Sequence, residues 1–360
     1  MNDIALLPIR YPLHAGLRCA IGRRAGTVLC AGIAAAMLHA PASAQSVAEF
    51  YAGRSIALSI GFTPGGGYDL YGRLVARHLS KHIPGNPKII PQNMPGAGSM
   101  VAAQHLFSIA PKDGTALATF GRQMGITPLL NPAAKYDGTK FTWLGSVTNE
   151  VSTCVTWRTS PVKVWADLLK HTVTFAGDGP RADPDVIANL YNNVFGTKIK
   201  VVSGYRGTGP MILAMERGEM DGFCGLSWST VKSRHMAWFK DKTINVLVQA
   251  AMRKEADLPE VPLALDLAKT EEQQQVLKVF LYGQEMARPF AAPPGIPADR
   301  RAALIAAFEA MLKDPEFLAE IKKLNLDLNP VSAPAIDAML KELYATPKAI
   351  LDRAALAAIK

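Results

Sequence analysis

The sequence has little that would bind a nucleotide, a nucleic acid or a metal ion. No Gly-Lys-Ser or Gly-Lys-Thr occurs in its 360 residues, so a P-loop is excluded. Gly96-Ala97-Gly98 is not a dinucleotide fingerprint, because Val101 stands where the third glycine would be. No H-E-x-x-H motif is present, and the basic residues form no clustered stripe. We therefore expect no cofactor, no metal site and no nucleic-acid partner.

Cysteine is scarce. The chain has four cysteines, of which only Cys154 and Cys224 lie beyond residue 44. Both sit in apolar, strand-like runs, VSTCVTW and MDGFCGL. An exported protein with two cysteines can form one disulfide, and two buried free thiols are the alternative. The sequence leaves both readings open.

The first 44 residues differ from the rest. Four arginines precede an apolar run over 25–40, and Ala42 and Ala44 supply the small residues of a cleavage site. The apolar run is short for a membrane-spanning helix. We therefore predict a cleaved signal peptide over 1–44, a mature chain that begins near Gln45, and a periplasmic location.

Beyond residue 45, short apolar runs alternate with Gly-rich turns and amphipathic segments. Strands are expected at 55–62, 87–93, 115–121, 172–177, 198–205, 220–227 and 244–250. The β-prone stretch 141–157 has no helix after it and reads as a connection leaving the first lobe. With 49% hydrophobic residues the chain can bury a substantial core. This pattern predicts an α/β protein with two parallel-sheet lobes joined by two crossings, near 149–153 and 286–289.

The expected lobes follow from these crossings. Residues 45–150 begin the first lobe and 151–285 form the second. Residues 286–360 make a Pro-rich return segment and C-terminal helices that complete the first lobe. Ser99 and Asp314 are the expected N-caps of two helices.

Four Gly-rich loops follow predicted strands: TPGGGYD, MPGAGS, GDGP and YRGTGP. In an open parallel sheet, ligands bind outside the carboxyl ends of the strands, where exposed backbone N–H groups and helix N-termini favour an anion. A single glycine turn is weak evidence, because glycine also simply permits tight turns. Four such loops, split evenly between the lobes, favour an anion held between two facing edges.

Catalytic constellations are sparse. The stretch GLSWS is not a nucleophile elbow, because Ser229 occupies the second glycine position. His78 and His82 have a spacing that can hold a metal, but a solvated polar helix face is the favoured reading. Asp69 is a candidate base, although its position after a glycine turn is more typical of a helix cap paired with Arg73 four residues on.

Taken in order, several motifs resemble one family. GFTPGGGYDLYGRLVARHL, NMPGAGSMVAAQHL with APKDGTALATFG, GYRGTGPMILAMERGEMDG, and APPGIPADRRAALIAAF with DPEF are similar to the signatures of the tripartite tricarboxylate transporter receptor family, the Bug-type solute-binding proteins. The resemblance implies a two-lobed fold of the periplasmic-binding-protein type II class with a ligand cleft between the lobes. It implies a monomeric receptor, not an enzyme, that captures a small carboxylate and delivers it to membrane permease subunits.

The resemblance also implies a ligand site. Carried over residue by residue, it consists of Phe62, Pro64, Gly65, Gly66, Gly67, Tyr68, Asp69, Pro95, Gly96, Ala97, Gly98, Ser99, Gly177, Asp178, Gly179, Tyr205, Arg206, Gly207, Thr208, Gly225 and Ser227. The sequence departs from the family pattern at its third glycine, Gly67, with Tyr68 after it, and in GDGPRADPD, which carries Arg181 and three aspartates.

Two alternatives remain at this point. One is an enzyme on the same fold, with Asp69 or Asp178 as acid or base. The other is a ligand sensor that reports to a membrane receptor.

Overall fold

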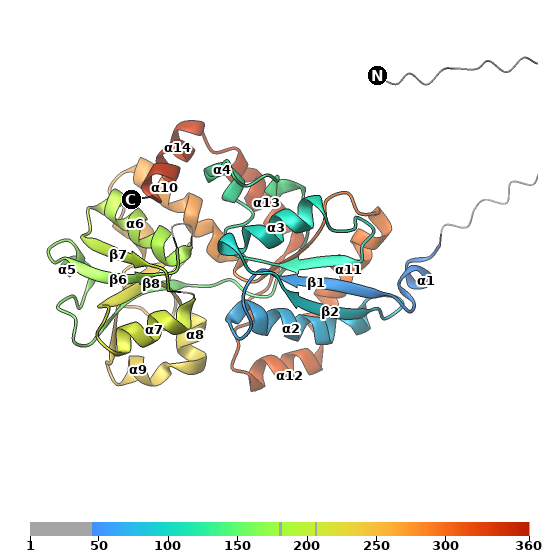
Figure 1. Cartoon of the computed structure of the whole chain (residues 1–360), viewed down its shortest axis with the longest axis horizontal. Helices are drawn as coiled ribbons and strands as arrows, with labels where there is room; N and C mark the ends of the chain where they lie inside the picture. The colour runs from blue at the N-terminus through green and yellow to red at the C-terminus, as the bar shows by residue number, and fades with distance from the viewer. Residues whose placement is uncertain (1–44, 180–181, 206, 360) are drawn as a thin grey trace, which may run out of the picture. The chain divides into compact units, whose positions relative to one another are not determined.

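The computed structural model describes residues 45–179, 182–205 and 207–359. Residues 45–360 form one compact unit (Figure 1). The predicted signal peptide lies outside the described residues. Within the described part of the chain, no helix is both long enough and apolar enough to cross a membrane.

The first sheet gathers strands from both ends of the chain. Its order is β11-β4-β10-β3-β1-β2. The strands are β1 (Ser55–Ile60), β2 (Lys88–Asn93), β3 (Ala116–Thr119), β4 (Thr142–Ser146), β10 (Pro289–Ala292) and β11 (Val331–Ser332). β1 pairs parallel with β2 and β3, whereas β10 is antiparallel to both β3 and β4. The sheet is therefore mixed, which corrects the expectation of parallel sheets.

Helices cover both faces of this sheet, which forms the first lobe; α2 and α3 lie on opposite sides of β1 (Figure 1). One face packs against α2 (Gly67–Leu79), α11 (Ala298–Met311) and α12 (Pro315–Lys323), and the other against α3 (Met100–Ser108) and α13 (Ala333–Tyr344). α2 begins at the last of the three glycines and buries Leu74, Val75 and Leu79, as their helical spacing predicts. Asp314 caps α12 by accepting the Glu316 N–H at 2.8 Å, which confirms that helix start.

The second sheet forms the second lobe, with the order β7-β6-β8-β5-β9. Its strands are β5 (Ser152–Trp157), β6 (Val173–Gly177), β7 (Ile199–Ser203), β8 (Gly222–Ser227) and β9 (Ile244–Ala250). β6 is parallel to β7 and β8, and β5 is antiparallel to β8 and β9. Its helices include α6 (Asp183–Phe195), α7 (Thr208–Glu216), α8 (Trp228–Arg234) and α10 (Glu271–Leu281).

Several shorter helices and turns also occur. They are α1 (Val47–Tyr51), α4 (Thr127–Leu130), α5 (Trp165–Leu168) and α9 (Met236–Lys240), with 3₁₀ turns at Ser80–His82, Ala97–Ser99, Gly138–Lys140, Ala264–Leu267 and Tyr282–Met286.

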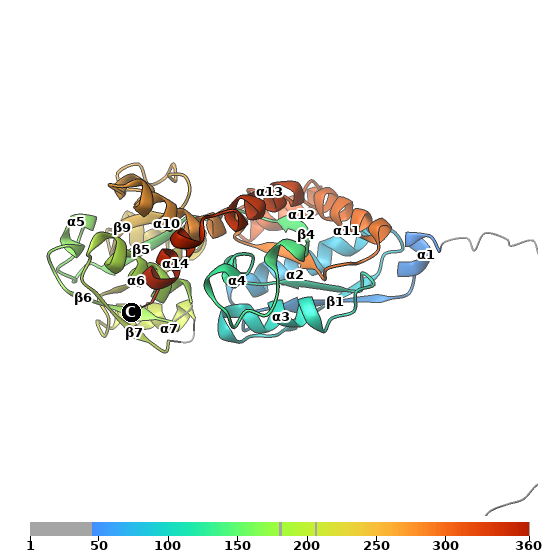
Figure 2. The same cartoon turned by 90° about the horizontal axis from the view of Figure 1, so that it is seen from above.

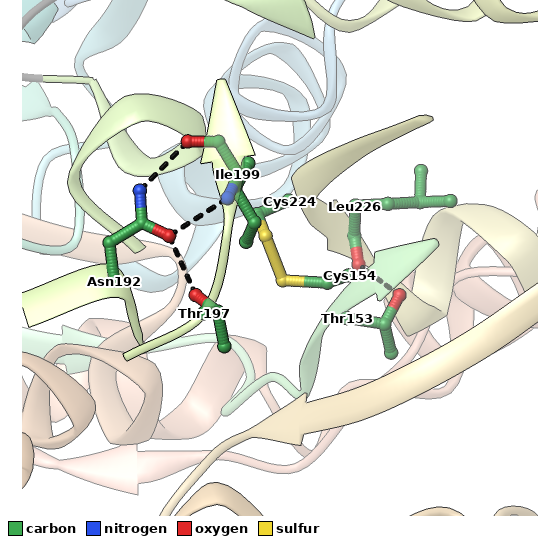
Figure 3. Close-up of a disulfide and its surroundings, with 7 residues drawn as sticks. All are labelled: Thr153, Cys154, Asn192, Thr197, Ile199, Cys224 and Leu226. Carbon is green, nitrogen blue, oxygen red and sulfur yellow. Dashed lines mark hydrogen bonds between the residues drawn. A yellow bond between two sulfur atoms is a disulfide. The ribbon is translucent and has the colours of Figure 1, made fainter. Parts of the chain in front are cut away.

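A disulfide joins Cys154 in β5 to Cys224 in β8 (Figure 3). The register of these antiparallel strands shifts at this point, because one residue of β5 faces two residues of β8. Gly225 is the extra residue and adopts a φ of 85°, which favours glycine. Both sulfur atoms belong to fully buried residues. The disulfide reading of the two cysteines is therefore the one that the structure shows.

Two chain segments connect the lobes side by side. Val147 N donates to Arg288 O (3.1 Å), Ala287 N to Thr148 O (3.1 Å) and Glu150 N to the carbonyl oxygen of Gln284 (2.9 Å). These two segments lie close to the predicted crossings.

The C-terminal helix α14 (Lys348–Ala357) makes a further connection between the lobes, which was not predicted (Figure 2). It follows α13 of the first lobe but packs against α6 and α10. Ala354, Ala357 and Ala358 belong to the core of the second lobe. Residues 286–360 were expected to complete the first lobe, and this helix departs from that expectation because its alanine-rich face fits closely between helices of the second.

Candidate functional site

The first-lobe loops meet at the carboxyl ends of β1, β2 and β3. The Ser99 hydroxyl accepts a hydrogen bond from Gly121 N at 3.0 Å, which ties the loop after β2 to the loop after β3. A Cβ atom on Gly61 would lie 1.8 Å from Ser99 Oγ, so only glycine fits at this position directly after β1. The structure thus brings the two predicted first-lobe loops together.

Asp69 holds the first loop in shape. As the third residue of α2, it accepts hydrogen bonds from Gly65 N (2.9 Å), Asn93 Nδ2 (2.8 Å) and Arg73 Nε (2.9 Å). Burial raises the pKa of this carboxyl, but those three donors outweigh burial and the pKa is lowered. The expected pair with Arg73 is confirmed. Asp69 is an anchored carboxylate, which argues against a role as general base.

Two aromatic side chains flank the same loop. The rings of Phe62 and Tyr68 stack with centroids 4.3 Å apart. The Tyr68 hydroxyl accepts a hydrogen bond from Arg122 N at 3.0 Å. The unusual tyrosine after the third glycine therefore links the start of α2 to the end of β3.

The second loop has an unusual backbone. Gly96, Ala97, Gly98 and Ser99 all have positive φ, at 146°, 47°, 62° and 83°. Ser99 stands at the N-cap position of α3, but its side chain makes no cap hydrogen bond, because the hydroxyl is engaged with Gly121. The expected cap role of this side chain is therefore wrong. Neither α2 nor α3 has a side-chain cap. At the start of α3, Met100 N and Val101 N donate to the carbonyl oxygens of Ala97 and Gly96, whereas among the described residues no backbone carbonyl occupies the first three amides of α2, which stay available to a ligand.

In the second lobe, aspartate side chains accept hydrogen bonds from backbone N–H groups of the glycine-rich loops. Asp178 Oδ1 accepts from Gly207 N at 3.0 Å, and Asp185 Oδ2 accepts from Gly179 N at 3.0 Å. Asp185 also fills the space beside Gly177, where a Cβ would lie 2.5 Å from Oδ2. Burial raises the pKa of Asp178, the Gly207 N–H lowers it, and nearby Asp185 raises it, with a net increase.

The remaining predicted residues lie around these aspartates. Tyr205 N donates to Gly177 O at 3.0 Å, and Gly207 is the N-cap of α7, with Thr208 as the first helical residue. Gly225 packs against Pro184 at the start of α6, and Ser227 is the N-cap of α8 without a side-chain cap. Arg181 and Arg206 lie outside the described residues.

An ion pair joins the loops of the two lobes. Arg122 follows β3, and its Nε lies 2.7 Å from the Asp183 Oδ2 atom at the first residue of α6. The Arg122 side chain is only 7% exposed, and its guanidinium also donates to Gln284 Oε1. Arg122 was not among the predicted site residues, although its place at the carboxyl end of a central strand was a usable signal.

The two histidines of α2 and the turn after it form a polar interface. His78 Nε2 lies 2.6 Å from the Glu320 carboxylate, and His82 Nε2 lies 2.8 Å from Asp314 in the neighbouring α12 segment. Among the described residues no group of histidine, cysteine and acidic side chains has the geometry to hold a metal ion. The histidines serve packing between helices.

Comparison with known sequences gives two relatives. The chain is 27% identical over 286 residues, 77% of each chain, to a UPF0065 protein from the TAR-I ttuE-ttuC' intergenic region of Agrobacterium vitis. It is 45% identical over 91 residues, 24% of this chain and 27% of the other, to a UPF0065 protein in the gbd 5' region of Cupriavidus necator. No family model matches the sequence.

Comparison with solved structures gives a consistent fold. The periplasmic binding protein BugD aligns with a TM-score of 0.65 at 18% identity, over 84% of this chain and 98% of its own. MatC from Rhodopseudomonas palustris, solved with bound malate, aligns with a TM-score of 0.62 at 21% identity, over 83% and 99%. A further R. palustris protein, solved with adipate, aligns with a TM-score of 0.63 at 18% identity, over 84% and 97%. The resemblance indicated by the ordered motifs is thereby confirmed, and the chain has the two-lobed α/β fold of the TctC- and Bug-type periplasmic binding proteins.

Proposed function

We propose that this protein is a periplasmic solute-binding receptor that captures a small carboxylate-bearing metabolite between its lobes and delivers it to a tripartite tricarboxylate-type membrane permease. The observation that carries the proposal is the meeting of the loops at Gly61–Gly67 and Pro95–Ser99. They surround the starts of two helices that have no side-chain cap. Such a place offers backbone N–H donors and partial positive charge, which suits a carboxylate.

The glycines of the first loop leave room for a ligand. Cβ atoms on Gly65 and Gly66 would meet nothing within 4 Å. Gly66 has an ordinary backbone, with φ −82° and ψ 173°, so its lack of a side chain is not needed for the turn itself. The open space beside Gly66 is not needed for the turn, and it can admit an approaching carboxylate.

The second lobe contributes differently. Its Gly179 and Gly207 amides already serve Asp185 and Asp178. We therefore assign the carboxylate to the first lobe, and we assign to the second lobe the contacts that read the rest of the ligand. The solved relatives that contain malate and adipate support a small carboxylate as the ligand class.

Binding is tested by calorimetry with malate, adipate and any small molecule that mass spectrometry finds in the purified protein. Gly66→Val should abolish binding of the carboxylate while circular dichroism stays unchanged, because the valine enters open space without backbone strain. Unchanged affinity would remove this loop from the site. Conversion of the ligand to a product over time would favour an enzyme instead.

Capture between lobes predicts closure around the ligand. A ligand that contacts the loops of both lobes binds the closed form more tightly than the open form, and it shifts the population toward the closed form by this difference in affinity. Small-angle X-ray scattering should show a smaller radius of gyration at saturating ligand. Delivery is tested by uptake of labelled ligand in cells that carry the candidate permease with and without this protein, and equal uptake in both would favour a sensor.

A further inference from the structure

Arg288 is a buried cation with few partners. It stands in the second crossing and is only 4% exposed. Its Nη1 donates to the carbonyl oxygen of neighbouring Ala287 at 2.9 Å. Its Nε has no hydrogen-bond partner among the described residues. A buried guanidinium normally has its N–H groups satisfied by carboxylates or carbonyls, because an unsatisfied buried charge costs free energy.

The nearest carboxylate, Glu150, does not meet this need. Its Oε2 lies 3.8 Å from Arg288 Nη2, which is beyond hydrogen-bonding distance. Glu150 is engaged instead with the second lobe, where its Oε1 accepts from Val151 N (3.0 Å) and Ser229 N (3.2 Å), and the Ser229 hydroxyl donates to Oε2. Glu150 therefore offsets the positive charge in part and leaves donors of Arg288 unused.

The guanidinium lies against the start of α2. Its Cζ is 4.6 Å from the ring centroid of Tyr68 and 5.3 Å from that of Tyr71. A Cβ atom on Gly67, the first residue of α2, would lie 3.1 Å from Arg288 Nη2. Two positive features thus adjoin, the side-chain cation and the N-terminus of a 13-residue helix without a side-chain cap.

Two further acidic side chains of this region have other partners. Asp69 of the first turn of α2 is directed to Gly65, Asn93 and Arg73. Asp183 pairs with Arg122.

We propose that Arg288 is the specificity-determining cation of the first-lobe subsite, where it binds one carboxylate group of the ligand together with amide groups of the first turn of α2. Gly67 is glycine because the guanidinium occupies the space that a side chain would need. This assignment rests on the proposed function and sharpens it, since it makes an ionised carboxylate a requirement. An amide in the same position would leave the buried charge unpaired.

The first test uses Arg288→Gln with Arg301→Gln as the matched control. Arg301 loses the same charge, and its Nη2 also lies 3.8 Å from a carboxylate oxygen, that of Asp337 on α13. Calorimetry compares malate and adipate with their monoamides. Arg288→Gln should weaken binding of the better dicarboxylate roughly 10- to 100-fold, as for loss of a charged hydrogen bond, and should remove the preference over the monoamide. Arg301→Gln should keep the affinity for the dicarboxylate and the preference over its monoamide.

The outcomes separate the two proposals. If the unmodified protein binds no carboxylate of the panel and none co-purifies, the proposed function and this inference both fail. If the unmodified protein binds a dicarboxylate and Arg288→Gln keeps the affinity and the preference over the monoamide, only the role of Arg288 is overturned.

A double-mutant cycle with Gly67→Ala covers the case in which Arg288→Gln does not fold. Alanine fits the helical backbone at position 67, and its methyl group displaces the guanidinium. We expect Gly67→Ala alone to weaken binding roughly 3- to 10-fold and to have no effect in the Arg288→Gln background. A loss of the same size in both backgrounds would mean that the methyl group acts on the ligand directly, and it would overturn the role of Arg288. Unchanged affinity and an unchanged preference over the monoamide in Gly67→Ala alone would also overturn the role of Arg288.

Discussion

The disulfide between Cys154 and Cys224 allows a quantitative prediction for the second lobe. The two residues are 70 positions apart in sequence, and the interval between them contains β6, β7 and the helices that cover them. The perturbation is full reduction under denaturing conditions followed by refolding in reductant. Reduction is preferable to substitution because it leaves the buried side chains in place.

The expected magnitude follows from the length of the closed interval. A cross-link of this span restricts the unfolded chain and stabilises the fold by roughly 2–4 kcal/mol in the chain-entropy description. With a slope of about 2 kcal/mol per molar urea, the middle of the usual range, the unfolding midpoint of the second lobe should fall by roughly 1–2 M. The first lobe contains neither cysteine, so its own transition should move much less.

Tryptophan fluorescence resolves the lobes, because Trp157, Trp165, Trp228 and Trp238 lie in the second and Trp143 in the first. Replacing Trp143 with Phe isolates the second-lobe signal. Two titratable thiols in the denatured, unreduced chain that begins at Gln45 would refute the pairing. An unchanged midpoint after confirmed reduction would refute the reasoning about its energetic role.

Three further expectations concern pH, an ion pair and a hydrogen bond. Hydrogen bonding to Lys81 holds the pKa of Asp314 well below its usual range, so the stabilisation that this carboxylate contributes is present above about pH 4 and is lost as the pH falls through the folded-state pKa. Asp314→Asn should therefore flatten the decline of the urea midpoint below pH 4, and a decline identical to that of the unmodified protein would contradict this. Each of the variants Arg122→Gln and Asp183→Asn should lower the free energy of unfolding by roughly 2–4 kcal/mol, because one buried charge loses its partner. The double variant should lose less than the sum of the two single losses, and additive losses would show that the pair is not coupled. Tyr68→Phe removes the acceptor for Arg122 N and should lower stability by about 1 kcal/mol, whereas an unchanged melting temperature would show that this hydrogen bond contributes nothing.

Local features of the fold were predictable because their cause is local. Glycines after an apolar run mark a strand end and a helix start whatever the rest of the chain does, and Asp69 and Arg73 meet because they are one helical turn apart. The shape of the first-lobe loops follows from such short-range rules. Their assignment as the ligand site remains a prediction.

Other features depend on partners far away in sequence. Arg122 meets Asp183 of the other lobe, and Arg288 reaches Gly67 across more than half of the chain. The position of Arg122 after a central strand marks it as a candidate ligand residue, but neither arginine has a nearby residue in sequence that identifies its partner. The Pro-rich stretch after residue 288 read as a connection, yet it contains β10, because Pro289 and the apolar residues after it fit between β3 and β4.

The insertion of β10 sets an order of events during folding. β3 and β4 are made early in synthesis, yet the strand that separates them is made some 140 residues after β4 ends. Until it arrives, both strands expose unpaired backbone edges of the kind that templates aggregation. The second lobe also waits, since alanines of α14 complete its core. The first lobe cannot be completed before β10 and α13 are available, and the second cannot be completed before α14, so a nascent or truncated chain would persist as an open, chaperone-dependent species and both lobes would form late in synthesis.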